Sequence, residues 1–227
     1  MQPKIIAFDA DDTLWDNEGY FEETEKRFCD LLADYHPPHT LAREILQTEV
    51  TNLPLYGYGI KGFILSMIET ALRISDKTLP VEAIEKIIQL GKELLEKPVN
   101  IIEDVEDVLD ELKKKYRLVM ATKGDLLDQH RKLHKSGLGP YFHHIEIMTE
   151  KKEDDYQKLI KRLDIQPSEF VMVGNSIKSD VLPVLHLGGR AFHIPYHTTW
   201  EHEKVEVKIV NKNFRQLSSI KEILQFV

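Results

Sequence analysis

The chain has few of the features that mark secreted or membrane proteins. Its single cysteine, Cys29, makes an internal disulfide impossible and suits a reducing compartment. No apolar run approaches the ~20 residues that cross a bilayer. A basic segment followed by an apolar stretch, the pattern of an export signal, is also missing from the first residues. We therefore expect a soluble, cytoplasmic protein without a membrane partner.

Positive charge is in short supply as well. The sequence has 30 Lys and Arg against 38 Asp and Glu, a formal net charge of −8 and a pI of about 5.7. This balance disfavours a nucleic-acid or anionic-membrane surface, because both need a positive counterpart. With 227 residues the chain can bury a substantial core and suits one domain with a sizeable insertion.

A short apolar run near the beginning, residues 5–8, ends abruptly in acidic residues. The run is typical of a buried strand in a parallel sheet. Directly after it come Asp9, Asp11, Asp12 and Thr13. Because clustered carboxylates repel one another, a cation is expected among them. Ligands of open α/β sheets bind beyond the carboxyl ends of strands, where this cluster falls. An acidic turn that caps the next helix through Asp12 or Thr13 explains the same residues.

The remaining sequence divides into a helical block and an alternating region. Helices are expected over residues 17–35, 40–51 (ending before Pro54), from 63 onward, and 80–97. Strands are expected over 117–121, 144–148, 170–173, 190–194 and 206–210, with a last helix over 213–226. Alternating strands and helices indicate a parallel sheet with helices on both faces. We predict an α/β, Rossmann-like core from residues 1–15 and 101–227, with residues 16–100 inserted as a helical domain.

Polar residues follow three later strands of this core. A strand ending in Thr122, Lys123 and Gly124 offers a hydroxyl and backbone N–H groups to an anionic oxygen, although the local sequence by itself favours a helix N-cap at Thr122 or Asp125. Lys151 and Lys152 follow the next strand, where a solvated surface is the simple interpretation. The third strand is followed by Gly174, Asn175 and Asp180.

These segments, in this order, resemble the motifs of the haloacid dehalogenase-like hydrolase superfamily: DxDx[TV], a strand-end Thr or Ser, a lysine, and GDxxxxD. The resemblance covers the whole chain, and the helical insertion resembles the family's C1-type cap domain. Two positions depart from the pattern. Lys123 replaces the Asn that often follows the threonine, and Asn175 replaces the first Asp of the last motif. An amide oxygen still ligates a hard cation but brings no charge, so the effect of Asn175 on metal binding stays open.

The resemblance implies an Mg²⁺-dependent hydrolase of small phosphate monoesters. Asp9 would be the nucleophile that forms an aspartyl-phosphate, and Asp11 the acid that protonates the leaving alcohol. Thr122 and Lys151 would hold the phosphoryl oxygens, with Lys152 as the alternative lysine. Asp12 would cap a turn. The implied metal ligands are Asp9, Asp11 (through its backbone carbonyl), Asn175 and Asp180. The candidate substrate-binding residues are Lys123, Gly124, Tyr58 and Lys61.

Other functions within this fold remain as alternatives. Haloacid dehalogenases carry a Tyr-type residue where this chain has Asp11, and a phosphonatase needs a cap lysine, for which Lys61 is the candidate. Phosphomutase chemistry is a third alternative. A non-catalytic binding protein, favoured by Asn175, is a fourth. The expected partner is a small phosphorylated metabolite that the sequence does not identify, and monomer and homodimer are both open. The histidines of segment 193–203 suggest zinc, but a loop that packs Trp200 is the simpler interpretation.

Overall fold

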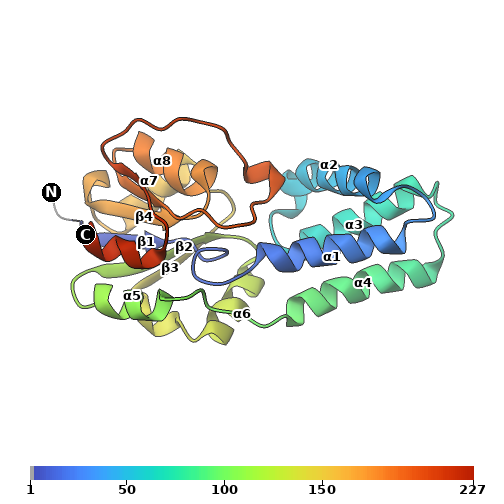
Figure 1. Cartoon of the computed structure of the whole chain (residues 1–227), viewed down its shortest axis with the longest axis horizontal. Helices are drawn as coiled ribbons and strands as arrows, with labels where there is room; N and C mark the ends of the chain where they lie inside the picture. Colours follow the sequence, from blue (N-terminus) through green and yellow to red (C-terminus); the bar gives the residue numbers. More distant parts are fainter. Residues whose placement is uncertain (1–2) are drawn as a thin grey trace. The chain divides into compact units, whose positions relative to one another are not determined.

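The computed structural model describes residues 3–227, which form two compact units (Figure 1). The first unit comprises the chain up to Glu18 together with Val99–Lys123 and His130–Val227. The second comprises Gly19–Pro98 and Gly124–Gln129. Within residues 3–227, no helix is both long and apolar enough to cross a membrane.

The first unit is built on a six-stranded sheet in the order β3-β2-β1-β4-β5-β6, with every neighbouring pair parallel. The strands are β1 (Ile5–Phe8), β2 (Arg117–Lys123), β3 (His144–Met148), β4 (Phe170–Gly174), β5 (Arg190–His193) and β6 (Phe214–Gln216). All four residues of β1 are apolar and buried, as expected for a central strand covered on both faces. The predicted α/β class with a Rossmann-like parallel sheet is confirmed.

Successive residues of β1 enter two different cores, because strand side chains alternate between the faces of a sheet. Ile6 and Phe8 pack in a cluster that includes residues of α5 (Val105–Leu112), α6 (Leu126–Ser136) and η5 (Ile220–Gln225). Ile5 and Ala7 pack in a second cluster with α7 (Glu153–Arg162) and α8 (Leu182–His186). Figure 1 shows α7 and α8 on one side of the strands and α5 on the other.

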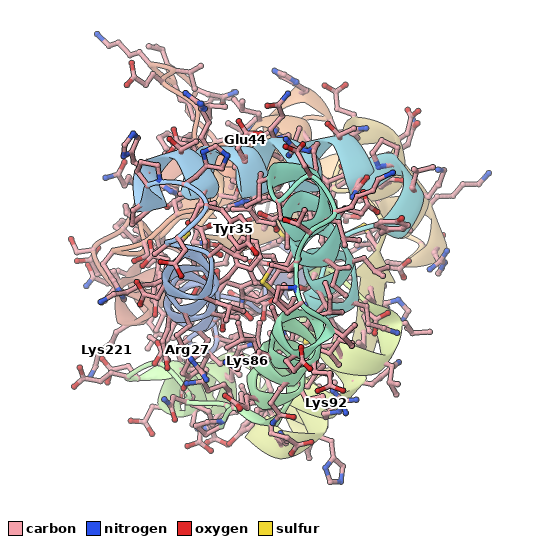
Figure 2. The ribbon with its side chains drawn as sticks, turned by 90° about the vertical axis from the view of Figure 1, so that its right-hand side faces the viewer. Arg27, Tyr35, Glu44, Lys86, Lys92 and Lys221 are labelled. Atoms are coloured by element: carbon pink, nitrogen blue, oxygen red, sulfur yellow. The ribbon has the colours of Figure 1, made fainter. Side chains whose placement is uncertain are left out.

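The second unit contains four helices around a core of its own. They are α1 (Glu18–Leu31), α2 (Pro38–Tyr56), α3 (Ile60–Ile74) and α4 (Val81–Glu96). Each helix turns a stripe of apolar side chains inward, among them Phe28, Leu41, Met67 and Leu90. The outer surface carries charged side chains such as Arg27 on α1 and Lys86 and Lys92 on α4 (Figure 2).

The chain leaves and re-enters the first unit at two adjacent points. The backbone N–H of Asp16 donates to the carbonyl of Asn100 at 2.9 Å, and Trp15 and Ile101 form an antiparallel bridge. The indole of Trp15 is fully buried in the first core, which anchors this pair of segments. Such a pairing allows the helical block to be inserted without disturbing the sheet.

Three sequence predictions about elements are wrong. Helix α2 does not end before Pro54 but runs to Tyr56. Pro54 has no N–H to donate, but the helix continues past it, and the N–H of Gly57 donates to the carbonyl of Leu53 at 2.9 Å. Residues 206–210 form no strand; of the alternating apolar residues in this segment, Val207 is exposed and Ile209 is only partly buried. The last strand is β6, inside the segment predicted as helix 213–226, and only η5 of that segment is helical.

Candidate active site

The polar residues that the sequence singled out lie at the ends of neighbouring strands. Asp9 follows β1, Thr122 lies in β2 and Asn175 follows β4, and β1 lies between the other two. The backbone N–H of Asp9 donates to the carbonyl of Val173 at 2.9 Å, which ties the nucleophile candidate to the end of β4. These side chains therefore meet at the carboxyl edge of the sheet, the usual ligand edge of such folds.

Lys151 joins two buried acidic residues of this edge, Asp9 and Asp180. Its Nζ donates to Asp9 Oδ1 at 2.5 Å and to Asp180 Oδ1 at 2.6 Å, and its side chain is only 2% exposed. The neighbouring Lys152 is 74% exposed and lies 4.0 Å from Glu150. Of the two lysines that the sequence left open, the structure brings Lys151 to the carboxylates.

The charge balance of this cluster is negative. Burial raises the pKa of Asp9 to about 7, and the carboxylates of Asp180 and Asp11 add to this shift, whereas Lys151 opposes it. Burial would lower the pKa of Lys151, but Asp180 and Asp9 together raise it, so the lysine stays charged. Two buried carboxylates thus share one ammonium, and an additional positive charge would relieve their repulsion.

Asp180 is fixed from several sides. Besides Lys151, it accepts a hydrogen bond on Oδ2 from the backbone N–H of Ser176 at 3.0 Å. The buried Tyr156 hydroxyl donates to the carbonyl of Ser179 at 3.1 Å. A Cβ on Gly174 would lie only 2.2 Å from Asp180 Oδ2, so the close approach of this carboxylate requires glycine at the end of β4.

Asp11 lies in a different environment from Asp9. Its Oδ1 accepts from the indole Nε1 of Trp15 at 2.7 Å and from Nζ of Lys132 at 2.6 Å, and its side chain is 23% exposed. Lys132 on α6 also donates to Asn17 Oδ1 at 3.1 Å. Two carboxylates of one motif therefore have separate partners, an arrangement that suits separate roles.

Asp12 has a local structural task. Its backbone is left-handed, with φ of 59°, and its carboxylate accepts from the backbone N–H groups of Asn17 and Glu18 at the start of α1. Burial raises the pKa of this carboxyl to about 7, against the effect of these hydrogen bonds. The geometry agrees with the prediction that Asp12 caps a turn.

The strand-end segment of β2 contributes a hydroxyl and a lysine. Thr122 is buried, and its Oγ1 donates to the carbonyl of Lys123 at 3.2 Å. The Nζ of Lys123 donates to Ser179 Oγ at 2.9 Å and to Glu203 Oε1 at 2.7 Å. Gly124 has φ of 138°, which only glycine adopts readily, and its missing side chain leaves space for Gln129. The substrate-binding roles of Lys123 and Gly124 stay predictions.

Asn175 is held through both its side chain and its backbone. Its Oδ1 accepts from Thr13 Oγ1 at 3.4 Å, and its carbonyl lies 3.0 Å from Nε2 of His193. The side-chain amide therefore presents its oxygen toward the first motif, where the acidic residues are. Its position is compatible with the ligand role that the resemblance implies.

The two other candidate substrate residues, Tyr58 and Lys61, belong to the second unit. Lys61 forms an ion pair with Asp125 Oδ2 at 2.7 Å and is 59% exposed. That pair lowers the pKa of Asp125, against the opposing effect of burial. A role of either residue in recognising a substrate stays a prediction.

The donors at the carboxyl edge fit a hard divalent cation. Among residues 3–227, no group of three or more His, Cys, Asp and Glu side chains is arranged to hold a metal. A cation here would need Asp9 and Asp180 together with the amide oxygen of Asn175 and the backbone carbonyl of Asp11. All of these donors are oxygens, which Mg²⁺ prefers, and the uncompensated charge of the two carboxylates supplies the attraction.

The sequence does not predict a site role for Lys132 or Glu203, two further residues of this network. Lys132 reaches Asp11 from the middle of α6, where a lysine on a polar helix face gives no local signal. Glu203 lies at the end of segment 193–203, which the sequence marked as unexplained but assigned to no role. The spacing of residues along the chain does not report contacts of this kind, because the fold creates them.

The chain is similar to known proteins of one family. The model for the haloacid dehalogenase-like hydrolases matches residues 3–188. A glyceraldehyde 3-phosphate phosphatase from Methanothermobacter thermautotrophicus is 26% identical over 241 aligned residues, covering 98% of this chain and 97% of that protein. The N-acylneuraminate-9-phosphatase of Rattus norvegicus is 33% identical over 94 residues, which cover 39% of this chain and only 38% of that protein.

A solved structure agrees with this assignment. A haloacid dehalogenase-like family hydrolase from Xanthomonas campestris superimposes with a TM-score of 0.87 and is 33% identical, covering 97% of this chain and 88% of that one. Since the family model spans most of the chain, this protein belongs to the haloacid dehalogenase-like hydrolases.

Proposed function

We propose that this protein is an Mg²⁺-dependent phosphatase that hydrolyses small phosphate monoesters through an aspartyl-phosphate on Asp9. The observation that carries the proposal is the buried Asp9–Lys151–Asp180 cluster, in which one ammonium lies 2.5 Å from the nucleophile candidate and 2.6 Å from its acidic neighbour. A strand-end carboxylate beside a fixed cation suits attack on an anionic phosphoryl group. The phosphatase names of the relatives support the same reaction class.

In the first step, an oxygen of Asp9 attacks phosphorus, and the bond between phosphorus and the ester oxygen breaks. Lys151 compensates the charge of the phosphoryl oxygens, and the hydroxyl of Thr122 orients them. Asp9, Asn175, Asp180 and the backbone carbonyl of Asp11 would hold Mg²⁺, which would supply further compensation of negative charge when bound. In the second step, water attacks phosphorus, releases phosphate and regenerates the Asp9 carboxylate.

Asp11 moves the proton in both steps. It donates a proton to the departing alkoxide and then takes one from the attacking water, which returns it to its starting state. Its hydrogen bonds from Trp15 and Lys132, at 2.7 and 2.6 Å, both engage Oδ1 and fix the orientation of the carboxyl group. We assign these two residues to positioning the acid.

The rival functions have weaker support. A phosphonatase needs a lysine amine that can form a Schiff base, whereas Lys61 is engaged in an ion pair with Asp125 at 2.7 Å. A dehalogenase has no use for a proton donor at Asp11. We propose residues 1–15 and 101–227 as the catalytic core and residues 16–100 as a cap that selects the leaving group, with Tyr58 and Lys61 as its candidate contacts.

The test is phosphate release from a panel of monoesters, including glyceraldehyde 3-phosphate and an N-acylneuraminate 9-phosphate, with Mg²⁺ and with chelator. Asp9→Asn should lower turnover by ~10⁴-fold or more, since the nucleophile is lost. Asp154→Asn, an exposed substitution of the same kind on α7, serves as the matched control and should have no effect. Equal phosphate release by Asp9→Asn and wild type, or turnover that is unchanged by chelator, would refute the proposal.

A further inference from the structure

Segment 193–203 ends in a carboxylate that the proposed reaction does not use. Glu203, in η4 (Glu201–Glu203), is only 12% exposed. Its Oε1 accepts from Lys123 Nζ at 2.7 Å, and its Oε2 accepts from the hydroxyls of Ser176 and Ser179, both at 2.6 Å. Because Lys123 Nζ also donates to Ser179 Oγ at 2.9 Å, the four side chains form one closed network.

This network differs from an ordinary surface ion pair. The side chains of Lys123 and Glu203 are 15% and 12% exposed, so removing one partner would leave the other charge poorly solvated. Burial by itself would raise the pKa of Glu203, but Lys123 and the two serine hydroxyls outweigh it and hold the pKa at about 2. The carboxylate is therefore charged, and each of its oxygens has a donor.

The network reaches the reacting groups through a short, unusual turn. Residues Ile177–Val181 form η3, a single π-helical turn, an element that is rare and occurs often at functional sites. Ser176 caps it, since its Oγ accepts from the backbone N–H of Ser179 at 3.0 Å. The backbone N–H of Ser176 in turn donates to Asp180 Oδ2 at 3.0 Å. Glu203 thus holds the same serine that holds Asp180, whose other oxygen contacts Lys151.

A second bond ties η4 to the same turn. Nζ of Lys178 donates to the carbonyl of His202 at 2.7 Å. His202 and Glu203, two successive residues of segment 193–203, therefore contact Lys178 and Ser179 within the turn and Ser176, which caps it. The segment braces the motif that carries Asn175 and Asp180, which gives it a role that neither zinc binding nor packing of Trp200 provides.

We propose that Glu203 is a positioning residue of the active site: it neutralises Lys123 and clamps the Ser176–Ser179 turn, so that Asp180 and Lys151 stay aligned with Asp9. The inference rests on the proposed function for its effect on catalysis, but its structural part does not. The proposed role of Glu203 also accounts for Lys123, one of the two departures from the family pattern. Lys123 brings a positive charge next to Thr122, and Glu203 compensates that charge within the same network.

The kinetic test compares Glu203→Gln, Lys123→Met and the double variant in the full chain. Glu203→Gln should lower kcat by ~10²-fold, because small misplacements of reacting groups have effects of this size. KM should change by less than ~3-fold, since substrate contacts are retained. The double variant should recover at least ~10-fold in kcat over Glu203→Gln, because no uncompensated ammonium remains. Glu201→Gln, in the same turn but 62% exposed in its pair with Lys204, is the matched control and should match wild type.

Hydrogen exchange supplies a readout that does not depend on turnover. In Glu203→Gln, the backbone amides of Ser179 and Asp180 should exchange at least ~10-fold faster than in wild type, while the strands of the sheet exchange as before. Glu201→Gln should leave these amides unchanged. Unchanged exchange in Glu203→Gln, a loss confined to KM, or a double variant no better than Glu203→Gln would each overturn the inference. If wild type hydrolyses no phosphate ester, the proposed function fails, and the exchange experiment still decides the structural role of Glu203.

Discussion

At the scale of single residues, Glu203 has a pH dependence that follows from its partners. Its pKa of about 2 lies below the ordinary 4.5, because Lys123 and two hydroxyls outweigh the effect of burial. A carboxyl whose pKa is lowered by folding stabilises the fold above its unfolded pKa and loses that contribution as the pH falls through its folded pKa. The difference between 4.5 and about 2 corresponds to about 3 kcal/mol, at 1.36 kcal/mol per pKa unit.

We therefore predict that Glu203→Gln lowers the free energy of unfolding by up to about 3 kcal/mol at neutral pH. The difference in the free energy of unfolding between wild type and variant (the stability gap) should be constant above pH 4.5. It should become smaller as the pH falls toward about 2. Urea unfolding of both proteins from pH 7 to pH 3 measures this gap. Glu201→Gln should show a gap near zero throughout, because exposed pairs contribute little. A gap that does not depend on pH would contradict this account.

Some residues of the candidate site could be predicted from the sequence, and others could not. Asp9, Thr122 and Asp180 stand out in the sequence because each lies at the end of an apolar strand or after it. For the motif lysine, the sequence favours Lys151 and leaves Lys152 as the alternative, because only the structure shows which of the two side chains is buried. Lys132 contacts Asp11 across 121 positions of sequence, and no local pattern reports such a contact.

At the scale of elements, the end of β4 depends on a glycine. A Cβ on Gly174 would lie 2.2 Å from Oδ2 and 2.3 Å from Cγ of Asp180. That carboxylate is held by Lys151 at 2.6 Å and by the N–H of Ser176 at 3.0 Å, so it cannot move aside without breaking these bonds. Strand β4 and the turn that follows it therefore pack so closely that position 174 has room only for glycine.

We predict that Gly174→Ala lowers the free energy of unfolding by about 1–3 kcal/mol, the usual cost of overpacking a core. Turnover should fall by ~10²-fold, because the displaced Asp180 no longer aligns Lys151. Gly139→Ala is the control, since a Cβ added at Gly139 would meet nothing within 4 Å. Thermal unfolding and phosphate release measure the two effects. Normal turnover in Gly174→Ala would show that the position of Asp180 is not critical.

Strands and helices could be predicted from the sequence where the local apolar pattern coincides with a segment that is buried in the fold. Strand β1 and the helix predicted over residues 80–97, observed as Val81–Glu96, satisfy both. The prediction for residues 206–210 failed because alternation of apolar residues predicts a strand only if one face is covered, and Val207, which alternates with Ile209, is 49% exposed. The strand forms instead at β6, where pairing with β5 is available. Tertiary pairing, which the sequence pattern does not contain, decided between the two segments.

At the scale of the whole molecule, each unit has its own apolar core, but the buried Asp9–Lys151–Asp180 cluster belongs to the first unit. Asp9 and Asp180 share Lys151, and burial and Asp11 both contribute to the raised pKa of Asp9. A ligand that binds only the folded protein stabilises it in proportion to the logarithm of its concentration. A cation at the carboxyl edge of the sheet should therefore appear as an increase in global stability, independently of any substrate.

We predict that Mg²⁺ raises the free energy of unfolding by about 2.7 kcal/mol at a hundredfold excess over its dissociation constant, relative to chelator. Asp180→Asn should abolish most of this increment, whereas Asn175→Asp should enlarge it at low Mg²⁺, because a carboxylate attracts the cation more strongly than an amide. Met67→Ala, in the buried core of the second unit, should lower stability by about 2–5 kcal/mol and leave the increment unchanged. Thermal unfolding across a magnesium titration measures all four proteins. An identical midpoint with Mg²⁺ and with chelator in wild type would remove the metal from the proposed reaction, and the charge of the Asp9–Lys151–Asp180 cluster would then have to be compensated by the substrate-binding residues alone.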